Sequence, residues 1–179
     1  RITGIIMDLK NIARAEPEEE REKFNLKETI LGVLRLLNPA INKKEIRVIV
    51  EVPDDIMLDG GRAKLSQALI NLFTNSIEAI QDKGGKITIR MSETTEGEHI
   101  LEIVDSGEGI AEGMQTKIFE PFFTTKSGTG GTGLGLPLTR TLLGGLGYSI
   151  SIKSRLKEGT RVSISIPVKN IQRDAVHHS

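Results

Sequence analysis

The sequence predicts an α/β domain that combines three helices with about five strands. Three segments place apolar residues at helical spacing, and five shorter segments alternate apolar and polar residues. Clusters of glycine, proline and asparagine separate them. The chain has 179 residues, 37% of them hydrophobic, which suits one domain with its own core and a short extension.

The three predicted helices begin near residues 25, 61 and 134. The first carries leucine, isoleucine and valine every third or fourth position from Leu26, and Pro39 interrupts it near its end. The second covers 61–82 and stops at Gly84. The third covers 134–146 and has a proline in its first turn, where proline is tolerated. A short helix is also expected at 114–119.

The predicted strands share a period of two. They cover residues 45–52, 86–91, 99–104, 148–153 and 160–168, and 56–58 is a candidate for a further short strand. His99 begins the third of these strands and stands apart from the other two histidines. We expect it at the surface.

The two ends of the chain are expected to lie outside the domain. Residues 1–16 contain an amphipathic helical pattern, with Ile2, Ile5, Ile6, Leu9 and Ile12 on one face. Residues 17–24 start with Pro17 and an acidic run, and predict a linker. Residues 169–179 predict a frayed tail, and the final His177-His178-Ser179 suggests a tag remnant.

Composition limits the function classes. Lys plus Arg and Asp plus Glu both number 24, so the net charge is zero and no bulk attraction to nucleic acid is expected. The absence of cysteine excludes disulfides, thiolate metal sites and thiol catalysis. No stretch approaches the roughly 18 to 20 apolar residues of a membrane span.

Two glycine-containing segments point to a ligand. The turn Asp105-Ser-Gly-Glu-Gly109 closes a predicted strand, so its carboxylate can accept hydrogen bonds from an amino group while the glycines let a flat ligand approach. The run Gly131-Thr-Gly-Leu-Gly135 opens a helix, where bare N–H groups bind phosphate. One segment therefore suits a base and the other a phosphate chain. The intervening loop at 124–132 has almost no side chain able to pack, which predicts a mobile lid.

A polar stripe runs along the second helix. Asn71, Asn75 and Glu78 lie at i, i+4 and i+7, so they share one face. Taken alone, this pattern fits a solvent-facing stripe better than a ligand site. Carboxamides are nevertheless suitable Mg²⁺ ligands. A nominal dinucleotide fingerprint from Gly128 to Gly133 is discounted because no strand precedes it.

Four motifs in order are more specific than any of them alone. They are Asn71-Leu-Phe-Thr-Asn75-Ser-Ile-Glu-Ala79, Asp105-Ser-Gly-Glu-Gly109, Phe119-Glu-Pro-Phe122 and Gly131-Thr-Gly-Leu-Gly135. This order resembles the N box, first G box, F box and second G box of the catalytic and ATP-binding domain of bacterial sensor histidine kinases. These belong to the GHKL ATPase superfamily, with type II topoisomerases and mismatch-repair ATPases. The Phe-Phe-Thr-Thr-Lys sequence ending at Lys126 resembles the form that the F box takes in the subgroup of nitrogen-regulation and sporulation kinases.

The resemblance implies a Bergerat-type two-layer α/β sandwich, in which three helices cover one face of a mixed sheet of about five strands. It places the catalytic and ATP-binding domain at 25–168 and makes 1–16 the C-terminal end of a dimerisation and phosphoacceptor hairpin. The implied cofactors are ATP and Mg²⁺. The implied partners are ATP or ADP, the dimerisation domain of a homodimeric parent, and the receiver domain of a response regulator. A cytoplasmic location follows, whether or not the parent carries a membrane anchor.

The resemblance also assigns residue roles. Asp105 would accept from the adenine amino group, Asn75 would hold Mg²⁺, and the second G box would wrap the phosphates. Asn71 and Lys126 are the expected catalytic residues, with Lys126 reaching the terminal phosphate. The expected nucleotide contacts are Asn75, Asp105, Gly107, Gly109, Ile110, Thr125, Lys126, Gly131, Thr132, Gly133, Leu134, Gly135, Leu136 and Thr160.

Two features depart from the family pattern. No histidine lies between Arg1 and Glu98, so the phosphoacceptor is missing from this chain. Glu78 and Ala79 stand where many members carry a basic residue and an aromatic one.

Two rival functions remain open. An ATP hydrolase or clamp of the superfamily usually has a glutamate at the position of Asn71, and an asparagine lacks the proton affinity of a general base. A degenerate nucleotide sensor is the other rival, and a transfer assay separates it from a kinase.

Overall fold

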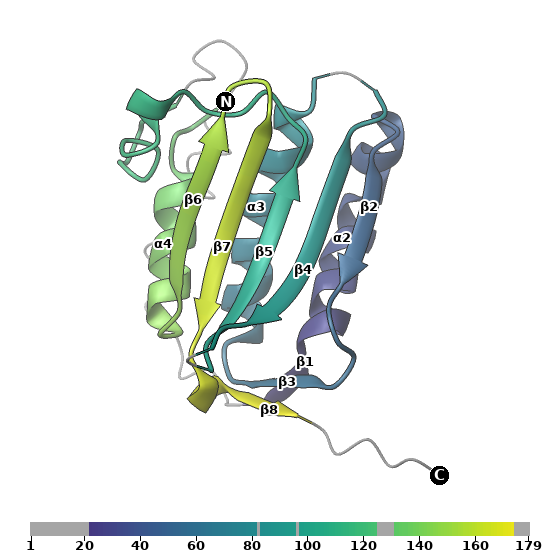
Figure 1. The fold of residues 1–179 in the computed structure, drawn as a ribbon, viewed down its shortest axis with the longest axis vertical. Helices are drawn as coiled ribbons and strands as arrows, with labels where there is room; N and C mark the ends of the chain where they lie inside the picture. The colour runs from purple at the N-terminus through teal and green to yellow at the C-terminus, as the bar shows by residue number, and fades with distance from the viewer. Residues whose placement is uncertain (1–21, 82, 96, 125–130, 174–179) are drawn as a thin grey trace.

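The computed structural model describes residues 22–81, 83–95, 97–124 and 131–173. A five-stranded sheet with the order β2-β4-β5-β7-β6 forms one layer (Figure 1). Its strands are β2 (Arg47–Glu51), β4 (Lys86–Glu93), β5 (His99–Asp105), β6 (Ser149–Arg155) and β7 (Gly159–Ile166). The β2 strand runs parallel to β4, and the other pairings are antiparallel. The sheet is therefore mixed.

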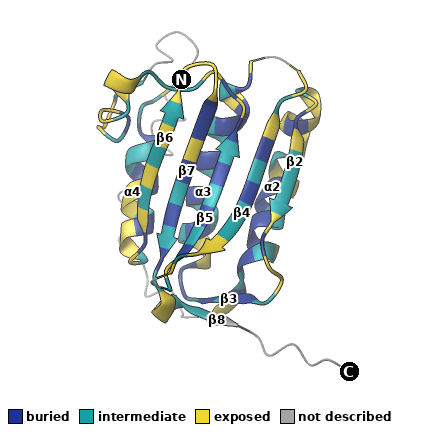
Figure 2. Ribbon diagram, in the orientation of Figure 1, coloured by how far each residue is buried: buried dark blue, intermediate teal, exposed yellow. Residues whose placement is uncertain are grey.

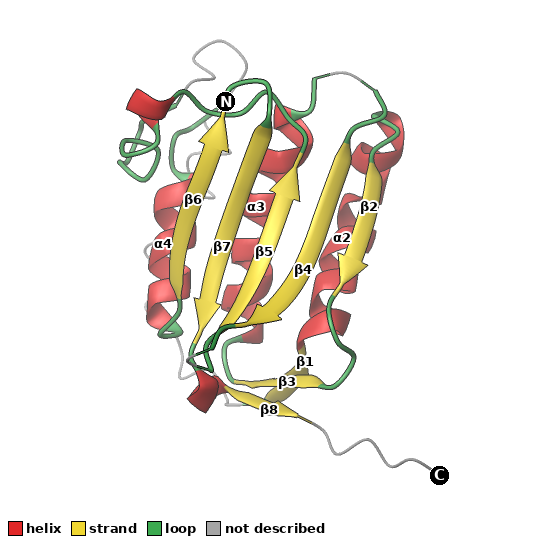
Figure 3. Cartoon of the chain, viewed as in Figure 1, coloured by secondary structure: helices red, strands yellow, loops and turns green. Residues whose placement is uncertain are grey.

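Three α-helices in the described part of the chain form the second layer: α2 (Leu26–Lys43), α3 (Arg62–Ala79) and α4 (Gly135–Gly145). They all lie on one face of the sheet, with α3 in the middle (Figure 3). This arrangement confirms the predicted two-layer sandwich. Between β5 and α4, the expected short helix is only the 3-10 turn η1 (Glu112–Met114) followed by further turns.

The core lies between the two layers. Inward-facing residues of the central strands, such as Ile89, Leu101 and Ile164, are fully buried, as are Leu69 and Phe73 of α3 (Figure 2). The strict alternation along β5 buries every second residue from His99 to Asp105. This alternation delivers Asp105 to the helix-covered face of the sheet, at the end of its strand.

Helix α2 continues past Pro39 to Lys43, further than the sequence predicts. Asn25 caps its start, where the side-chain Oδ1 accepts from Glu28 N at 2.9 Å. Pro39 lies in the last turns, so it removes only one hydrogen bond near the end of the helix. Buried Ile41 holds the final turn against the core.

A second, three-stranded sheet lies at the other end of the main sheet from Asp105 (Figure 1). Strand β3 (Ile56–Asp59) pairs antiparallel with β1 (Lys23–Asn25) on one side and β8 (Ile171–Arg173) on the other. The predictions of a linker and a frayed tail are wrong for these short strands. With three residues each, both strands are too short to show a periodic hydrophobic pattern, and each is stabilised by pairing with β3. Residues 1–21 and 174–179 lie outside the described residues.

The prediction for His99 is also wrong. Only 6% of His99 is exposed, because it starts a central strand that pairs with β4 on one side and β7 on the other. The Oε2 atom of Glu93 lies 3.8 Å from His99 Nε2. Among the described residues, no helix is long and apolar enough to cross a bilayer.

Candidate functional site

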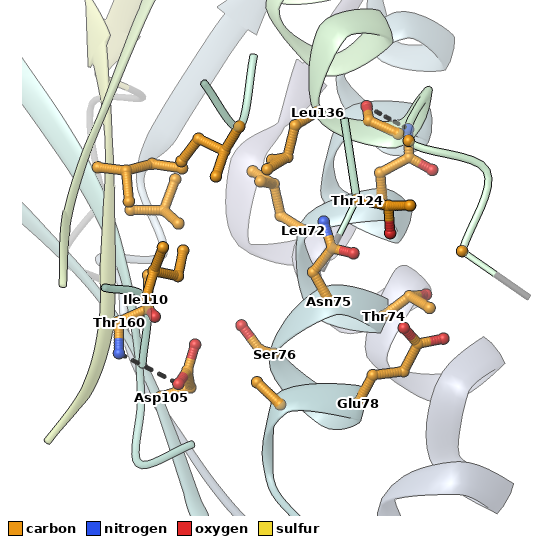
Figure 4. A pocket seen from close by; sticks show the side chains of 18 of the residues that line it. Leu72, Thr74, Asn75, Ser76, Glu78, Asp105, Ile110, Thr124, Leu136 and Thr160 are labelled. Atoms are coloured by element: carbon orange, nitrogen blue, oxygen red, sulfur yellow. Dashed lines mark hydrogen bonds between the residues drawn. The ribbon is translucent and has the colours of Figure 1, made fainter. Parts of the chain in front are cut away.

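A cavity of about 340 Å³ opens at the end of the sheet where β5 stops. Its walls come from the C-terminal half of α3, the end of β5, the middle of β6, the start of β7, and the segment that leads into α4 (Figure 4). Segments far apart in sequence therefore meet at one site. The four motifs found in the sequence contribute to or border this cavity.

Asp105 is the buried carboxylate of the cavity, with only 5% of the residue exposed. Its Oδ1 accepts from Gly107 N at 2.9 Å and from Thr160 N at 3.2 Å. Burial raises the pKa of Asp105, opposed by the hydrogen bonds from Gly107, Ser76 and Thr160, which favour the ionised form. These bonds fix the carboxylate, and its other oxygen points into the space beside α3 (Figure 4).

Two glycines shape the turn after Asp105. Gly109 lines the cavity with a φ of 72°, and a Cβ there would run into the Arg155 carbonyl. Gly107 lies behind the cavity instead, where a Cβ would be 2.7 Å from that of Ala79. Glu108 N donates to Ala79 O at 3.0 Å, so this turn is fastened directly to the end of α3.

An apolar wall extends from Asp105 toward the start of α4 and suits a flat ring. Ile110, Leu136 and Leu72 are joined by two strand residues, Ile152 and Val162, which sequence analysis did not select. Thr160 adds a hydroxyl beside the carboxylate. Strand alternation predicts that residues such as Ile152 face inward, but not that they lie within a site.

The opposite end of the cavity is formed by the segment entering α4. Gly131, Thr132, Gly133, Gly135 and Leu136 all line it. Phe122 N donates to Gly133 O at 3.0 Å, which closes the intervening loop at its base. Leu134 is buried behind this wall, and its N–H lies 3.3 Å from Thr132 Oγ1. Thr125 and Lys126 lie outside the described residues, as does most of the expected lid.

The polar stripe of α3 faces the cavity. Asn71, Asn75 and Glu78 all line it, and Figure 4 shows Asn75 projecting between Leu72 and Thr124. The Nδ2 of Asn71 lies 3.4 Å from both Gly135 O and Thr139 Oγ1, so it contacts the first turn of α4. This stripe is therefore part of the site, and not only a solvated surface.

A family model described as histidine kinase-, DNA gyrase B-, and HSP90-like ATPase matches residues 60–170, more than half of the chain. The chain belongs to this ATPase family. It is 35% identical to the solved catalytic domain of the histidine kinase ThkA, with a TM-score of 0.72, and the match covers 83% of this chain and 95% of that one. The chain is thus an ATP-binding catalytic domain of the histidine kinase type.

Curated relatives are longer than this kinase catalytic domain. Sporulation kinase B of Bacillus subtilis is 35% identical over 168 residues, which make up 93% of this chain but 38% of that protein. A structure of ThkA in complex with the response regulator TrrA is 30% identical, with a TM-score of 0.74, covering 93% of this chain and 48% of that one. The chain therefore spans well under half of the curated relative's length.

The charged residues that line this cavity are all acidic within the described part of the chain. They are Glu78, Asp105 and Glu108, and no lysine or arginine of that part lines the cavity. A triphosphate entering such a site needs positive charge from elsewhere.

Lys44 binds the end of α3 that forms part of the cavity wall, without lining the cavity itself, and sequence analysis did not select it. Its ammonium donates to Ile77 O at 2.7 Å and also to the carbonyl of Ile80, at the C-terminal end of α3. These carbonyls lack partners within the helix. Lys44 therefore caps α3 close to the point where Glu108 is fastened.

Lys44→Met is expected to destabilise the fold by about 2 kcal/mol, because it leaves half-buried carbonyls without a charged donor. Urea denaturation measures the change. Lys43→Met is the matched control, since Lys43 is the exposed neighbour in the last turn of α2. Equal midpoints for the two variants would contradict a capping role.

Proposed function

We propose that this chain binds ATP with its adenine against Asp105 and its phosphates near the start of α4. Within a longer protein it would then transfer the terminal phosphoryl group to a histidine on another segment. The observation that carries the proposal is one cavity with a fixed carboxylate at one end and the helix start at the other. The apolar wall between them would hold the purine ring.

Asn75 would hold Mg²⁺ together with the phosphate oxygens. A neutral carboxamide oxygen on the cavity wall fits this ion, which normally takes only one or two protein ligands. The acidic lining supports the same assignment, because it disfavours a triphosphate without a cation. When bound, the ion would neutralise charge that develops on the phosphates.

In the transfer step, a histidine nitrogen would form a bond to the terminal phosphorus while the bond to the ADP oxygen breaks, so that ADP leaves. The residues of this chain would position the reactants and exclude water. Asn71 supports transfer over hydrolysis, because a carboxamide bonded to the first turn of α4 cannot take a proton from water. Lys126 would reach the terminal phosphate, and Thr125 would contribute beside it.

The wider setting of the domain is also proposed. Residues 1–16 would be the C-terminal end of a dimerisation and phosphoacceptor hairpin, and residues 17–22 would link it to the domain. The parent would be a cytoplasmic homodimer, with or without an anchor, that phosphorylates the receiver domain of a response regulator. The ThkA complex with TrrA supports the last of these partners by analogy.

Asn75→Ala is expected to reduce Mg²⁺-dependent transfer by about a hundredfold while weakening nucleotide binding far less, because the lost ligand acts mainly on charge that develops during reaction. Single-turnover transfer and calorimetry measure the two effects. Asn75→Asp keeps an oxygen ligand and tests whether ligation or neutrality matters. Normal transfer by Asn75→Ala would exclude Asn75 as the ligand.

The deciding experiment supplies a histidine-bearing hairpin, taken from a homologous kinase, to this chain in trans with labelled ATP and Mg²⁺. Label on the hairpin supports a kinase. Release of inorganic phosphate with an unlabelled hairpin would instead indicate a hydrolase, and binding without either product a nucleotide sensor.

A further inference from the structure

The hydroxyl of Ser154 lies behind the wall of the nucleotide cavity and has no role in the site as described so far. Ser154 lies on β6, on the face that points toward the helices. Its Oγ lies 2.8 Å from Ile110 N, 2.9 Å from Gly159 O and 2.9 Å from Thr160 Oγ1. One hydroxyl thus joins the segment after Asp105 to the start of β7.

The direction of these three hydrogen bonds follows from counting protons. A serine hydroxyl has one proton to donate and two lone pairs. The Gly159 carbonyl can only accept, so it takes the Ser154 proton, while Ile110 N–H donates to Ser154. Thr160 can therefore bond to Ser154 only by donating its own proton. Its oxygen is left with lone pairs alone.

A second side chain, Gln115, holds the backbone on both sides of the Ser154 hydroxyl. Gln115 Nε2 donates to Ser154 O at 2.7 Å and to Ile110 O at 3.2 Å. This carboxamide ties the two backbones whose groups meet at the Ser154 hydroxyl. This arrangement therefore resists a rotation that would release the Thr160 proton.

The direction of the hydrogen bond from Thr160 to Ser154 matters for a ligand, because Thr160 lines the cavity beside Asp105. Both groups then face a ligand as acceptors. Adenine carries an amino group, a donor, where hypoxanthine and guanine carry a carbonyl oxygen. A carbonyl placed against two acceptors has no partner, which is costly in a buried site.

We propose that Ser154 is a positioning residue for base selectivity: by taking the Thr160 proton, it holds the Thr160 hydroxyl as an acceptor and so favours amino-bearing purines over carbonyl-bearing ones. This inference rests on the proposed nucleotide function of the same cavity. It adds a residue outside the cavity wall that acts through one inside it.

The test compares ATP and ITP, which differ at this ring position, by calorimetry with Mg²⁺ on the whole chain. Ser154→Ala releases the Thr160 proton to meet the ITP carbonyl, so the ratio of the ATP and ITP affinities is expected to fall about tenfold. Ser154→Thr keeps a hydroxyl and is expected to retain the ratio. Ser151→Ala is the matched control, because Ser151 is an exposed serine of the same strand.

A double-mutant cycle separates action through Thr160 from a general loosening of the wall. Thr160→Val is expected to lower the ratio, and Ser154→Ala added to it is expected to change the ratio no further. A ratio within twofold of the wild type in Ser154→Ala, or an equal drop in the Thr160→Val background, overturns the proposal. If Ser154→Ala does not fold, Ser154→Cys keeps the volume with a weaker donor and carries the same expectation. A wild-type chain that binds neither nucleotide would refute the proposed function itself.

Discussion

Asp105→Asn is expected to weaken ATP binding on the order of a hundredfold, the largest loss for any single substitution in this site. The asparagine Oδ1 can still accept from Gly107 and Thr160, so its NH₂ group takes the place of the oxygen that points into the cavity. That group would meet the adenine amino group donor to donor. Calorimetry with ATP and Mg²⁺ measures the loss, and an unchanged affinity would exclude Asp105 as the adenine partner.

The stability of this variant provides the control. Burial raises the pKa of Asp105, so its carboxyl group binds a proton more tightly in the folded state than in the unfolded state. The stabilising contribution is therefore complete below the unfolded pKa and is lost as the pH rises through the folded pKa. At neutral pH the buried carboxylate lowers the free energy of unfolding. The Asp105→Asn variant is therefore expected to melt at the same temperature as the wild type or higher. A large drop in melting temperature would show that lost affinity reflects unfolding.

Gly109→Ala is expected to destabilise the domain by about 2 kcal/mol and to weaken ATP binding by about tenfold or more. Two effects add at this position. A φ of 72° is strained for alanine, and the new Cβ would meet the Arg155 carbonyl. Relief of the clash would move the turn away from β6 and pull Ile110 from the Ser154 hydroxyl.

Gly113→Ala is the matched control for this substitution. Gly113 lies four residues further along, and a Cβ there meets nothing within 4 Å. Its stability and ATP affinity are expected to stay at the wild-type level. Thermal melts and calorimetry on both variants check the pair, and equal behaviour would mean that the approach of Gly109 to β6 is not needed.

Local patterns in the sequence were sufficient to predict the main sheet and its helices. Helical spacing from Leu26 and strict alternation along residues 99–105 are properties of short segments, and both elements form as expected. The carboxylate at the end of β5 could be placed for the same reason. The turn after this carboxylate contains Gly107 and Gly109, and both positions lie too close to neighbouring backbone to accept a Cβ atom.

Features that depend on tertiary pairing could not be predicted in this way. Strands β1 and β8 have three residues each and are held by β3, from a distant part of the chain. His99 looked exposed because its burial comes from strands on both sides. Ser154 and Lys44 act through neighbours remote in sequence, and no local pattern marks a side chain for that role.

The small sheet contains the first strand of the described domain, so a force applied from the N-terminal side would act on it first. Within the described residues, strand β1 pairs with β3 alone, at the end of the molecule away from Asp105 (Figure 1). A pull applied at residue 22 would therefore load the β1 and β3 ladder, with β8 bracing β3 from the other side. The cavity beside Asp105 would then lie at the end of the domain opposite the point of loading (Figure 1). A rigid rotation of the domain about the small sheet would therefore carry the cavity through an arc without changing the distances within it.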